Sequence, residues 1–382
     1  MNRKIDRKLL SATRCAGEGM TIDCLVFYSD AVLTKAYFQS RGIKIVGEYL
    51  FIKAFLVRVT EEEIVCLAKK NYIKNLSSNS KAFTMMNVAK KVIGTTELGL
   101  SGKGVTIAYI DTGIHPHLDF MLQKNRIVFF KDFINGKKNA YDDNGHGTFV
   151  AGVGSGSGLL SCGKFSGVAP ASNIISLKAL DKNGEAGSER ILDAMQWVYD
   201  NRRKFEIRVV CMSFGSEPLG FSDPMMKGAE ALWKEGIVIT AAAGNSGPGF
   251  ETIKSPGISP YILTVGGFDD CRNEDDNFNQ SSFKIADFSS RGPALKRFKP
   301  DVVAPSVNIK SCGIKSGYIK LSGTSVATPM IAGAAALLLE KNGQLSPNQI
   351  KSVLITASKP ITYNKNLEGY GVPGVKRATR LI

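Results

Sequence analysis

The sequence predicts an α/β protein whose mostly parallel sheet is covered by helices on both faces, preceded by a small α+β domain. From residue 104 onward, near-continuous apolar runs alternate with segments of helical character. Such runs are typical of parallel strands that are buried on both faces and joined by helices. Residues 20–80 follow a different pattern, in which two helical segments separate short strands. We therefore expect two domains, residues 1–84 and residues 85–382.

The first domain is expected to hold strands and capped helices in alternation. Its predicted elements are strand 21–29, helix 30–42, a hairpin within 43–59, helix 60–71 and strand 72–76. Asp30 is the expected N-cap of the first helix, and Gly42 marks its end. Residues 77–90 turn polar and irregular, which indicates an exposed linker that a protease could cleave.

The second domain is expected to place polar groups at one edge of its sheet. The predicted strands are 104–111, 174–180, 207–214, 236–244 and 261–268, with helices at 188–204 and 225–236 between them. In open parallel sheets, functional side chains gather where the strands end and the next helices begin.

Composition excludes several classes of protein. Basic residues give a net charge of +15 but are scattered, with no basic–aromatic block of the kind that binds nucleic acid. The apolar stretch 326–339 is too short and too interrupted to cross a membrane. Seven cysteines at irregular spacing, with no CxxC pair, predict neither a disulfide framework nor a zinc site. The first 19 residues lack the apolar stretch of a secretory signal, so we expect a cytoplasmic location.

Four polar residues stand at strand ends or helix starts and could perform chemistry. Asp111 ends a buried strand, and His146 lies between two glycines. Asn245 follows another strand, and Ser325 begins an apolar helix, where unpaired N–H groups favour negative charge. Taken singly, each has a structural explanation as a turn residue or a helix cap.

Taken together, these residues resemble a known family. The segments "YIDTGI", "NGHGTFVAGVGSG", "AAAGNSG" and "SGTSVATPMIAGAAALL" are similar to the four signature blocks of the subtilisin family of serine proteases. The resemblance extends over roughly residues 85–382 and implies a three-layer α/β/α fold. It implies a serine endopeptidase of broad specificity, with Asp111, His146 and Ser325 as catalytic triad. Asn245 would bind the oxyanion of an acyl-enzyme pathway, and no cofactor would be needed for the chemistry.

The resemblance also implies a cleft that binds extended protein or peptide substrates. Its expected backbone partners are Gly184, Glu185 and Ala186 on one side, Ser213, Phe214 and Gly215 on the other, and Ala242, Ala243 and Gly244 as pocket walls. Lys254 falls near the pocket base, and no acidic residue is evident there. We therefore expect no preference for Lys or Arg in the substrate.

A structural calcium ion is not supported at the position where many secreted relatives hold one. Those relatives carry Asp where this chain has His117, and the loop 157–166 lacks carboxylates. His115 and His117 are expected at the surface. Asp142 and Asp143 have two interpretations, a weaker calcium site or solvated loop charge.

The first domain resembles the family's ferredoxin-like propeptide, which assists folding and then plugs the active-site cleft. The resemblance implies that this domain inhibits its own enzyme until self-cleavage near Ala82, Phe83 or Thr84. A permanent regulatory or interaction domain is the alternative. A long pro-segment without a signal would be unusual among intracellular members of the family.

Three other functions fit the sequence less well. Residues 158–166 nearly match a phosphate-binding loop, but Phe165 stands where Ser or Thr must reach the metal ion. A protease-like fold that only binds peptides has no physical need for Asp111, His146 and Ser325 together. An acid peptidase of the sedolisin kind would place a carboxylate at position 146.

Overall fold

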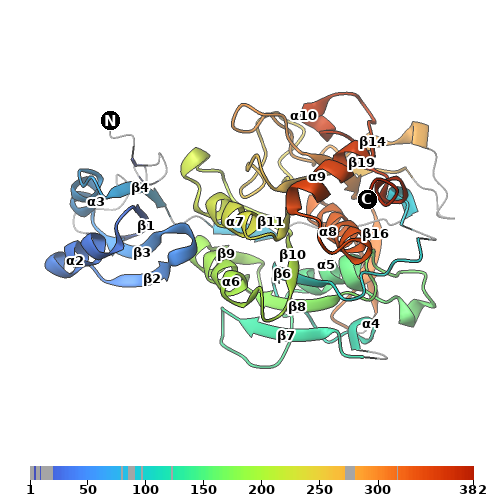
Figure 1. Cartoon of the computed structure of the whole chain (residues 1–382), viewed down its shortest axis with the longest axis horizontal. Coiled ribbons are helices and arrows are strands. Elements are labelled where there is room, and N and C mark those ends of the chain that lie inside the picture. The colour runs from blue at the N-terminus through green and yellow to red at the C-terminus, as the bar shows by residue number, and fades with distance from the viewer. Residues whose placement is uncertain are drawn as a thin grey trace.

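The computed structural model contains two domains that lie side by side (Figure 1). It describes residues 4, 5, 9, 20–78, 81–84, 91–95, 98–121, 124–271, 280–315 and 317–382. A four-stranded sheet forms the first domain, and an eight-stranded sheet forms the centre of the second.

The first domain has the predicted order of strands and helices. Its elements are β1 (Ile22–Tyr28), α2 (Ala31–Arg41), β2 (Ile45–Tyr49), β3 (Ala54–Val59), α3 (Glu61–Ala68) and β4 (Ile73–Ser78). The sheet order is β2-β3-β1-β4, and its neighbouring strands are antiparallel. Asp30 caps α2, and Gly42 ends it in the left-handed conformation, as predicted.

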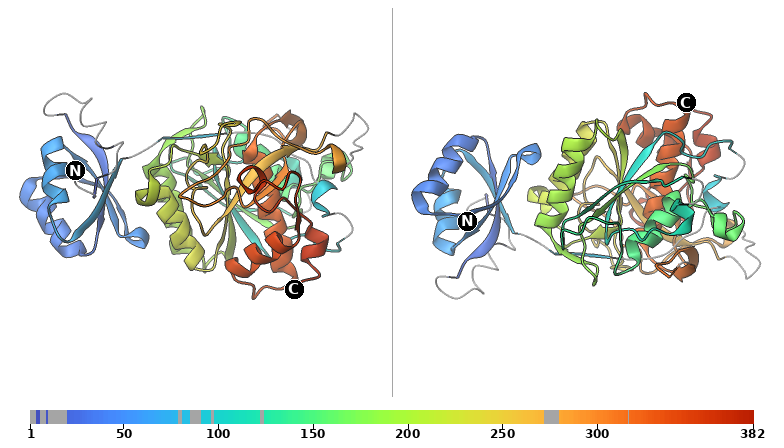
Figure 2. Two further views of the ribbon diagram at one scale, coloured as in Figure 1. Left: turned by 90° about the horizontal axis from the view of Figure 1, so that it is seen from above. Right: turned by 90° about the horizontal axis from the view of Figure 1, so that it is seen from below.

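Both faces of this small sheet are buried, against different partners. Val26 and Phe55 pack into a local core with α2 and α3. Leu25, Phe27 and Leu56, which point the other way because side chains alternate along a strand, join the core of the large domain. The sheet of the first domain faces the second domain (Figure 2), and the residues on that face are apolar.

The central sheet of the second domain is parallel except at one edge. Its strands are β6 (Thr106–Asp111), β7 (Ile127–Asp132), β8 (Asn173–Lys178), β10 (Ile207–Met212), β12 (Val238–Ala242), β13 (Leu263–Asp269), β14 (Lys284–Ile285) and β15 (Val302–Pro305). They follow the order β14-β13-β12-β10-β6-β8-β7, with β15 on β13, and only β14 runs antiparallel to its neighbour. The five predicted strands, β6, β8, β10, β12 and β13, are almost wholly buried, as their apolar runs predict, whereas β7 and β14 at the sheet edges are partly exposed.

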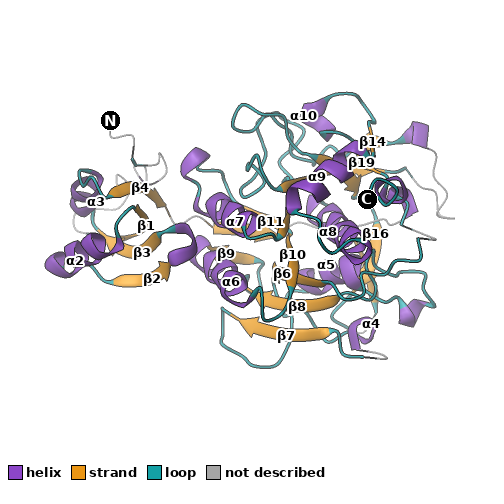
Figure 3. Cartoon of the chain, viewed as in Figure 1, coloured by secondary structure: helices purple, strands orange, loops and turns teal. Residues whose placement is uncertain are grey.

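Helices cover both faces of that sheet (Figures 2 and 3). α5 (His146–Ser155) and α8 (Thr324–Lys341) pack together on one face, and α6 (Ser188–Asn201) and α7 (Pro224–Lys234) pack together on the other. α8 is the central helix, because every residue from Thr324 to Leu339 is buried.

Shorter elements complete the chain. They are β5 (Lys81–Thr84), α4 (Leu118–Met121), β9 (Glu185–Gly187), β11 (Phe214–Gly215), β16 (Ile309–Cys312), β17 (Tyr318–Leu321), α9 (Pro347–Thr356), β18 (Ser358–Lys359), α10 (Lys365–Glu368), β19 (Val372–Pro373) and α11 (Val375–Ala378). β5 lies within the predicted irregular linker, so that interpretation of residues 81–84 is wrong. Across the described ranges, no helix is both long and apolar enough to span a membrane.

Candidate active site

The site lies at the carboxyl edge of the parallel sheet, where two central strands end next to each other. Asp111 is the last residue of β6. In the neighbouring strand β10, Met212 pairs with Ile110, so Ser213 follows at the same level as Asp111. The adjacent backbone therefore brings a predicted catalytic carboxylate next to a predicted substrate-binding segment.

A short hydrogen bond joins Asp111 to His146. His146 Nδ1 lies 2.6 Å from Asp111 Oδ1, which corresponds to a ring that donates its Nδ1–H to the carboxylate. The Thr112 backbone N–H also donates to Asp111 Oδ1, at 2.8 Å. Both the histidine and the aspartate are buried, so water does not compete for this bond.

A second aspartate fixes the loop that carries the histidine. Asp142 is buried and accepts hydrogen bonds from Thr112 Oγ1 and from the backbone N–H groups of Gly145 and Thr148. Gly147 cannot carry a side chain, because a Cβ there would lie 2.1 Å from the carbonyl oxygen of Gly113. The glycines of "NGHG" thus let α5 start directly against the end of β6.

Lys178 is a supporting residue that sequence reasoning missed. Its side chain is fully buried at the end of β8, where Nζ donates to the carbonyl oxygens of Thr112 and Leu180 and to Asp143 Oδ1. The sequence feature that could have revealed it is a single lysine in the otherwise largely apolar run 174–180. Asp143 is therefore ion-paired, and the Asp142 carboxylate is occupied by hydrogen bonds.

Ser325 occupies the second position of α8. Its side chain is buried, and within the described ranges its Oγ has no hydrogen-bond partner. α8 packs against α5, and the Gly244 N–H, which follows β12, donates to Thr324 Oγ1, so α8 begins at the carboxyl edge of the sheet. Pro329 lies inside the helix. It cannot donate the bond that the Ser325 carbonyl would otherwise accept.

Asn245 contacts the residue directly before Ser325. Its Oδ1 accepts hydrogen bonds from the Thr324 backbone N–H at 2.9 Å and from Thr324 Oγ1 at 3.0 Å. A backbone N–H can only donate, so the oxygen of this amide must face Thr324. The Nδ2 group consequently remains available as a donor.

The predicted substrate-binding strands enclose a segment of the chain itself. β5 lies between β9 and β11, antiparallel to both. Phe83 pairs with Glu185 on one side and Gly215 on the other, and Thr84 pairs with Phe214. The two backbone segments predicted to hold a substrate therefore lie on either side of one extended strand.

The third predicted segment forms a wall beside this cleft. Ala242 ends β12, and the backbone N–H of Gly244 donates to Thr324 Oγ1 at 3.1 Å, which ties the wall to the start of α8. Lys254 lies against it, because its N–H donates to the Ala243 carbonyl at 2.8 Å. The predicted location of Lys254 near these walls agrees with the structure.

His117 is buried, which contradicts its predicted surface position. Its ring packs edge-on against Phe120 and Tyr318, and its Nε2 lies 3.1 Å from the Gly317 carbonyl oxygen. Burial lowers the pKa of His117 below its usual value. Gly317 and Tyr318, about 200 residues later in the chain, cover the imidazole, so its burial could not be predicted from the neighbouring sequence.

The residues around His117 do not suit calcium. The side chains that could join His117 in holding a metal ion are those of Asp119 and Cys312, both buried. Calcium takes about six to eight oxygen ligands, which a histidine and a cysteine do not provide. Asp119 Oδ2 accepts a hydrogen bond from Tyr318 at 2.8 Å, and Oδ1 accepts one from the Leu160 N–H at 3.1 Å.

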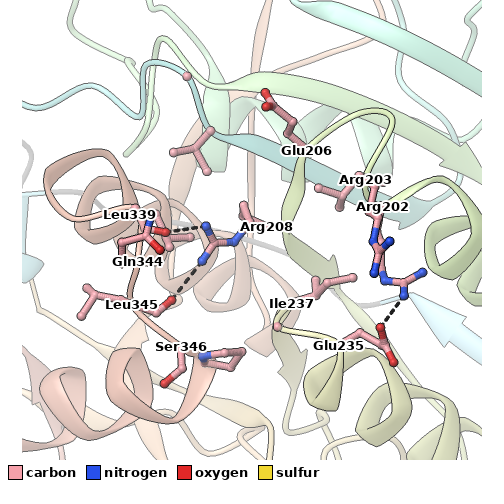
Figure 4. A pocket seen from close by; sticks show the side chains of 16 residues that line it. Arg202, Arg203, Glu206, Arg208, Glu235, Ile237, Leu339, Gln344, Leu345 and Ser346 are labelled. Carbon is pink, nitrogen blue, oxygen red and sulfur yellow. Dashed lines mark hydrogen bonds and ion pairs between the residues drawn. The ribbon is translucent and has the colours of Figure 1, made fainter.

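A cavity of about 700 Å³ lies at the other end of the strands (Figure 4). It is lined by Ile207, the first residue of β10, and by Ile237, which directly precedes β12. Arg208 crosses it and donates to the carbonyl oxygens of Gly343 and Leu345. The cavity is therefore separate from the edge that holds Asp111.

Comparison with known proteins gives consistent results. The sequence profile of the subtilase family matches residues 102–372. Serine protease AprX of Bacillus subtilis (strain 168) is 41% identical over 291 residues, 70% of this chain and 63% of that protein. Alkaline protease of Shouchella clausii is 30% identical over 348 residues, 88% of this chain and 82% of that protein. The chain thus spans less than two thirds of the length of AprX.

A solved structure shares the fold. Fervidolysin from Fervidobacterium pennivorans, described as a keratinolytic enzyme related to subtilisin, superimposes with a TM-score of 0.73. The match covers 96% of this chain and 62% of that one, at 21% identity. It therefore includes both domains and supports the fold alone.

Proposed function

Because the chain belongs to the subtilase family of serine proteases, we propose that it is an endopeptidase that hydrolyses protein substrates through an acyl-enzyme. The predicted family and the subtilisin-like fold are confirmed. The observation that carries the proposal is the buried 2.6 Å hydrogen bond between His146 and Asp111 at the edge where Ser325 begins its helix.

In the first half of the reaction, Ser325 Oγ attacks the peptide carbonyl while His146 Nε2 takes the hydroxyl proton. Asp111 keeps the imidazole in the tautomer that can accept this proton and stabilises the imidazolium. The carbonyl electron pair moves to the oxygen, which the Asn245 Nδ2–H and the Ser325 backbone N–H stabilise. The C–N bond then breaks as His146 returns its proton to the leaving amine.

In the second half, water replaces the amine. His146 removes a proton from the water as it attacks the Ser325 ester, and the same oxyanion donors stabilise the second intermediate. Collapse of this intermediate releases the carboxylic acid, and the proton returns to Ser325 Oγ. The residues end the cycle unchanged.

Substrate binding follows the arrangement of β5. A peptide that takes the place of residues 81–84 would form main-chain hydrogen bonds with β9 and β11 on both sides. Strand addition recognises backbone more than side chains, which supports a broad range of protein substrates.

The first domain is proposed to act as the enzyme's own inhibitor. It contacts α6 through Tyr49, whose hydroxyl donates to the Glu189 carbonyl at 3.3 Å, and a loop before α7 through Ser77, whose hydroxyl donates to the Ser222 carbonyl at 2.9 Å. Lys227 Nζ of α7 lies 4.1 Å from the centre of the Phe27 ring. These contacts support a domain that anchors β5 in the cleft and blocks access to it.

The direction of β5 supports self-cleavage just beyond it. Between Phe83 and Thr84 the strand passes from Gly215 to Phe214, that is, toward Ser213 and the end of β6. A chain that continues in this direction approaches the proposed nucleophile. We therefore place the cleaved bond after Thr84, in the segment 85–90, which lies outside the described residues.

Intact-mass analysis of the full chain over time tests the proposal. We expect loss of the first domain in the parent chain and no loss in Ser325→Ala, which removes the nucleophile. A parent chain that stays whole and neither hydrolyses casein nor reacts with a fluorophosphonate probe would identify a peptide-binding protein instead. Casein hydrolysis by an uncleaved chain would favour a permanent regulatory domain.

Two further expectations belong to the same proposal. The occupied carboxylate of Asp119 supports stability without calcium at that position. Function inside the cell stays a prediction from the sequence.

A further inference from the structure

Lys254 joins the two walls of the cleft at the side of the proposed nucleophile. Ser255 exchanges two backbone hydrogen bonds with Ser216, at 2.9 and 3.0 Å, which ties this segment to the strand after Gly215. The Lys254 N–H bonds to the Ala243 carbonyl on the other wall. A substrate strand that runs past Ser213 toward Asn245 would therefore place a side chain between these walls.

The stem of Lys254 fills the gap between two glycines. A Cβ at Gly215 would lie 2.6 Å from Lys254 Cβ, and a Cβ at Gly244 would lie 2.6 Å from Lys254 Cγ. Contacts this short on both sides mean that the lysine stem, rather than empty space, separates the walls. The space for a substrate side chain is therefore shortened by the stem of Lys254.

The charged end of Lys254 reaches the rim of this space. Its ammonium group is ion-paired with Glu217, and the lysine side chain is 15% exposed whereas the glutamate side chain is 59% exposed. An ion pair with such an exposed partner is weak, because water competes with it. A carboxylate on a bound substrate could therefore replace Glu217 as the partner of the ammonium group.

We propose that Lys254 and Glu217 determine which substrate residue precedes the cleaved bond, the P1 residue. The pair selects unbranched neutral or acidic P1 side chains and rejects lysine, arginine and large aromatic ones. A cationic side chain meets a like charge at the rim, where the ammonium group lies, and an aromatic ring meets the lysine stem. This inference rests on the proposed endopeptidase function.

Two residues of the proposed self-cleavage segment would be accepted at P1 under this inference. The segment proposed to contain the self-cleavage bond begins with Met85 and Met86, two unbranched neutral residues. Methionine has the length and flexibility to lie along the lysine stem.

The test uses fluorogenic peptides that differ only at P1, with Glu, Gln, Met, Lys or Phe, and enzyme obtained from the full chain after incubation. We expect kcat/KM for the Glu peptide to exceed that for the Lys peptide by at least about tenfold, the effect of one charge contact at a partly exposed site. Lys254→Met keeps an unbranched stem and removes the charge, so this ratio should fall toward one while Met cleavage is retained. Glu217→Gln frees the ammonium group and should raise the Glu-to-Gln ratio severalfold.

Lys234→Met is the matched control, because it removes the same charge from the exposed end of α7 and should leave every ratio unchanged. Equal ratios in the parent and Lys254→Met, with activity intact, would overturn the inference and leave the proposed function standing. A preference of the parent for Lys would also overturn it. A parent inactive on every peptide and on casein would instead overturn the proposed function.

Discussion

Asn245 offers a sharp test of the proposed chemistry, because its two ends have separate tasks. Oδ1 accepts the two hydrogen bonds from Thr324, and Nδ2 is the proposed oxyanion donor. Asn245→Asp keeps the size of the side chain and the acceptor oxygen but removes the donor. Asn245→Ala removes both.

The expected magnitudes differ between activity and stability. Loss of one oxyanion donor lowers kcat by about 10²–10³, so both variants should lose activity to this extent. Each accepted hydrogen bond contributes about 1 kcal/mol to stability, so Asn245→Ala should lower the free energy of unfolding by about 2 kcal/mol. Asn245→Asp should retain that stability, because its carboxylate still accepts both bonds at the N-terminal end of α8, where negative charge is favoured.

Self-cleavage provides a single-turnover assay that needs no added substrate. The rate at which the full chain converts to the shorter product, followed by intact mass, should fall in both variants. Urea unfolding of the Ser325→Ala versions of all three chains, which cannot self-cleave, gives the stabilities. A self-cleavage rate for Asn245→Asp within about threefold of the parent would refute the oxyanion role. Equal destabilisation of the two variants would refute the assignment of the two ends.

Three further predictions follow from single contacts, and stabilities are measured in the same Ser325→Ala background. Gly147→Ala should slow self-cleavage at least about 100-fold, because the new Cβ would lie 2.1 Å from the Gly113 carbonyl oxygen and must displace His146 or Asp111. The control is Gly343→Ala, whose Cβ would lie 3.7 Å from the Leu339 carbonyl oxygen, and its self-cleavage rate should not change. Burial raises the pKa of Asp301, but the ammonium groups of Lys299 and Lys351 outweigh this effect and hold that pKa below its usual range. Ionised Asp301 therefore stabilises the fold above about pH 4, and this stabilisation is lost as the pH falls through the lowered pKa. Asp301→Asn should therefore cost about 3–5 kcal/mol in urea unfolding at pH 7, with a smaller difference in acid, and an equal cost at both pH values would contradict the ion pairs. Chelation by EDTA should leave the melting temperature unchanged, whereas a fall of more than about 4 °C, reversed by calcium but not magnesium, would reveal a calcium site.

Local patterns in the sequence were sufficient for most of the fold. The apolar runs that end at Asp111 and near Met212 became neighbouring parallel strands. Asp30 and Gly42 delimit the helix that they were expected to delimit. These features depend on residues a few positions apart, whose periodicity and capping chemistry can be read directly along the chain.

The sequence also singled out four candidate residues, Asp111, His146, Asn245 and Ser325, because each stands where a strand ends or a helix begins. What it could not determine was how they contact one another. The orientation of the Asn245 amide depends on Thr324, 79 residues later. Lys178 supports the loop of His146 through the Thr112 carbonyl, 66 residues earlier. Neither contact leaves a periodic pattern in the sequence.

The tertiary structure alone decided three features. Residues 81–84 look like an irregular linker, yet they form a strand because β9 and β11, more than 100 residues away, offer free edges to pair with. His117 looks like a surface residue, yet Tyr318 covers it. Lys254 fills the gap between Gly215 and Gly244. In each case the partners are distant in sequence, so their effect exists only once the chain has folded and brought them within contact distance.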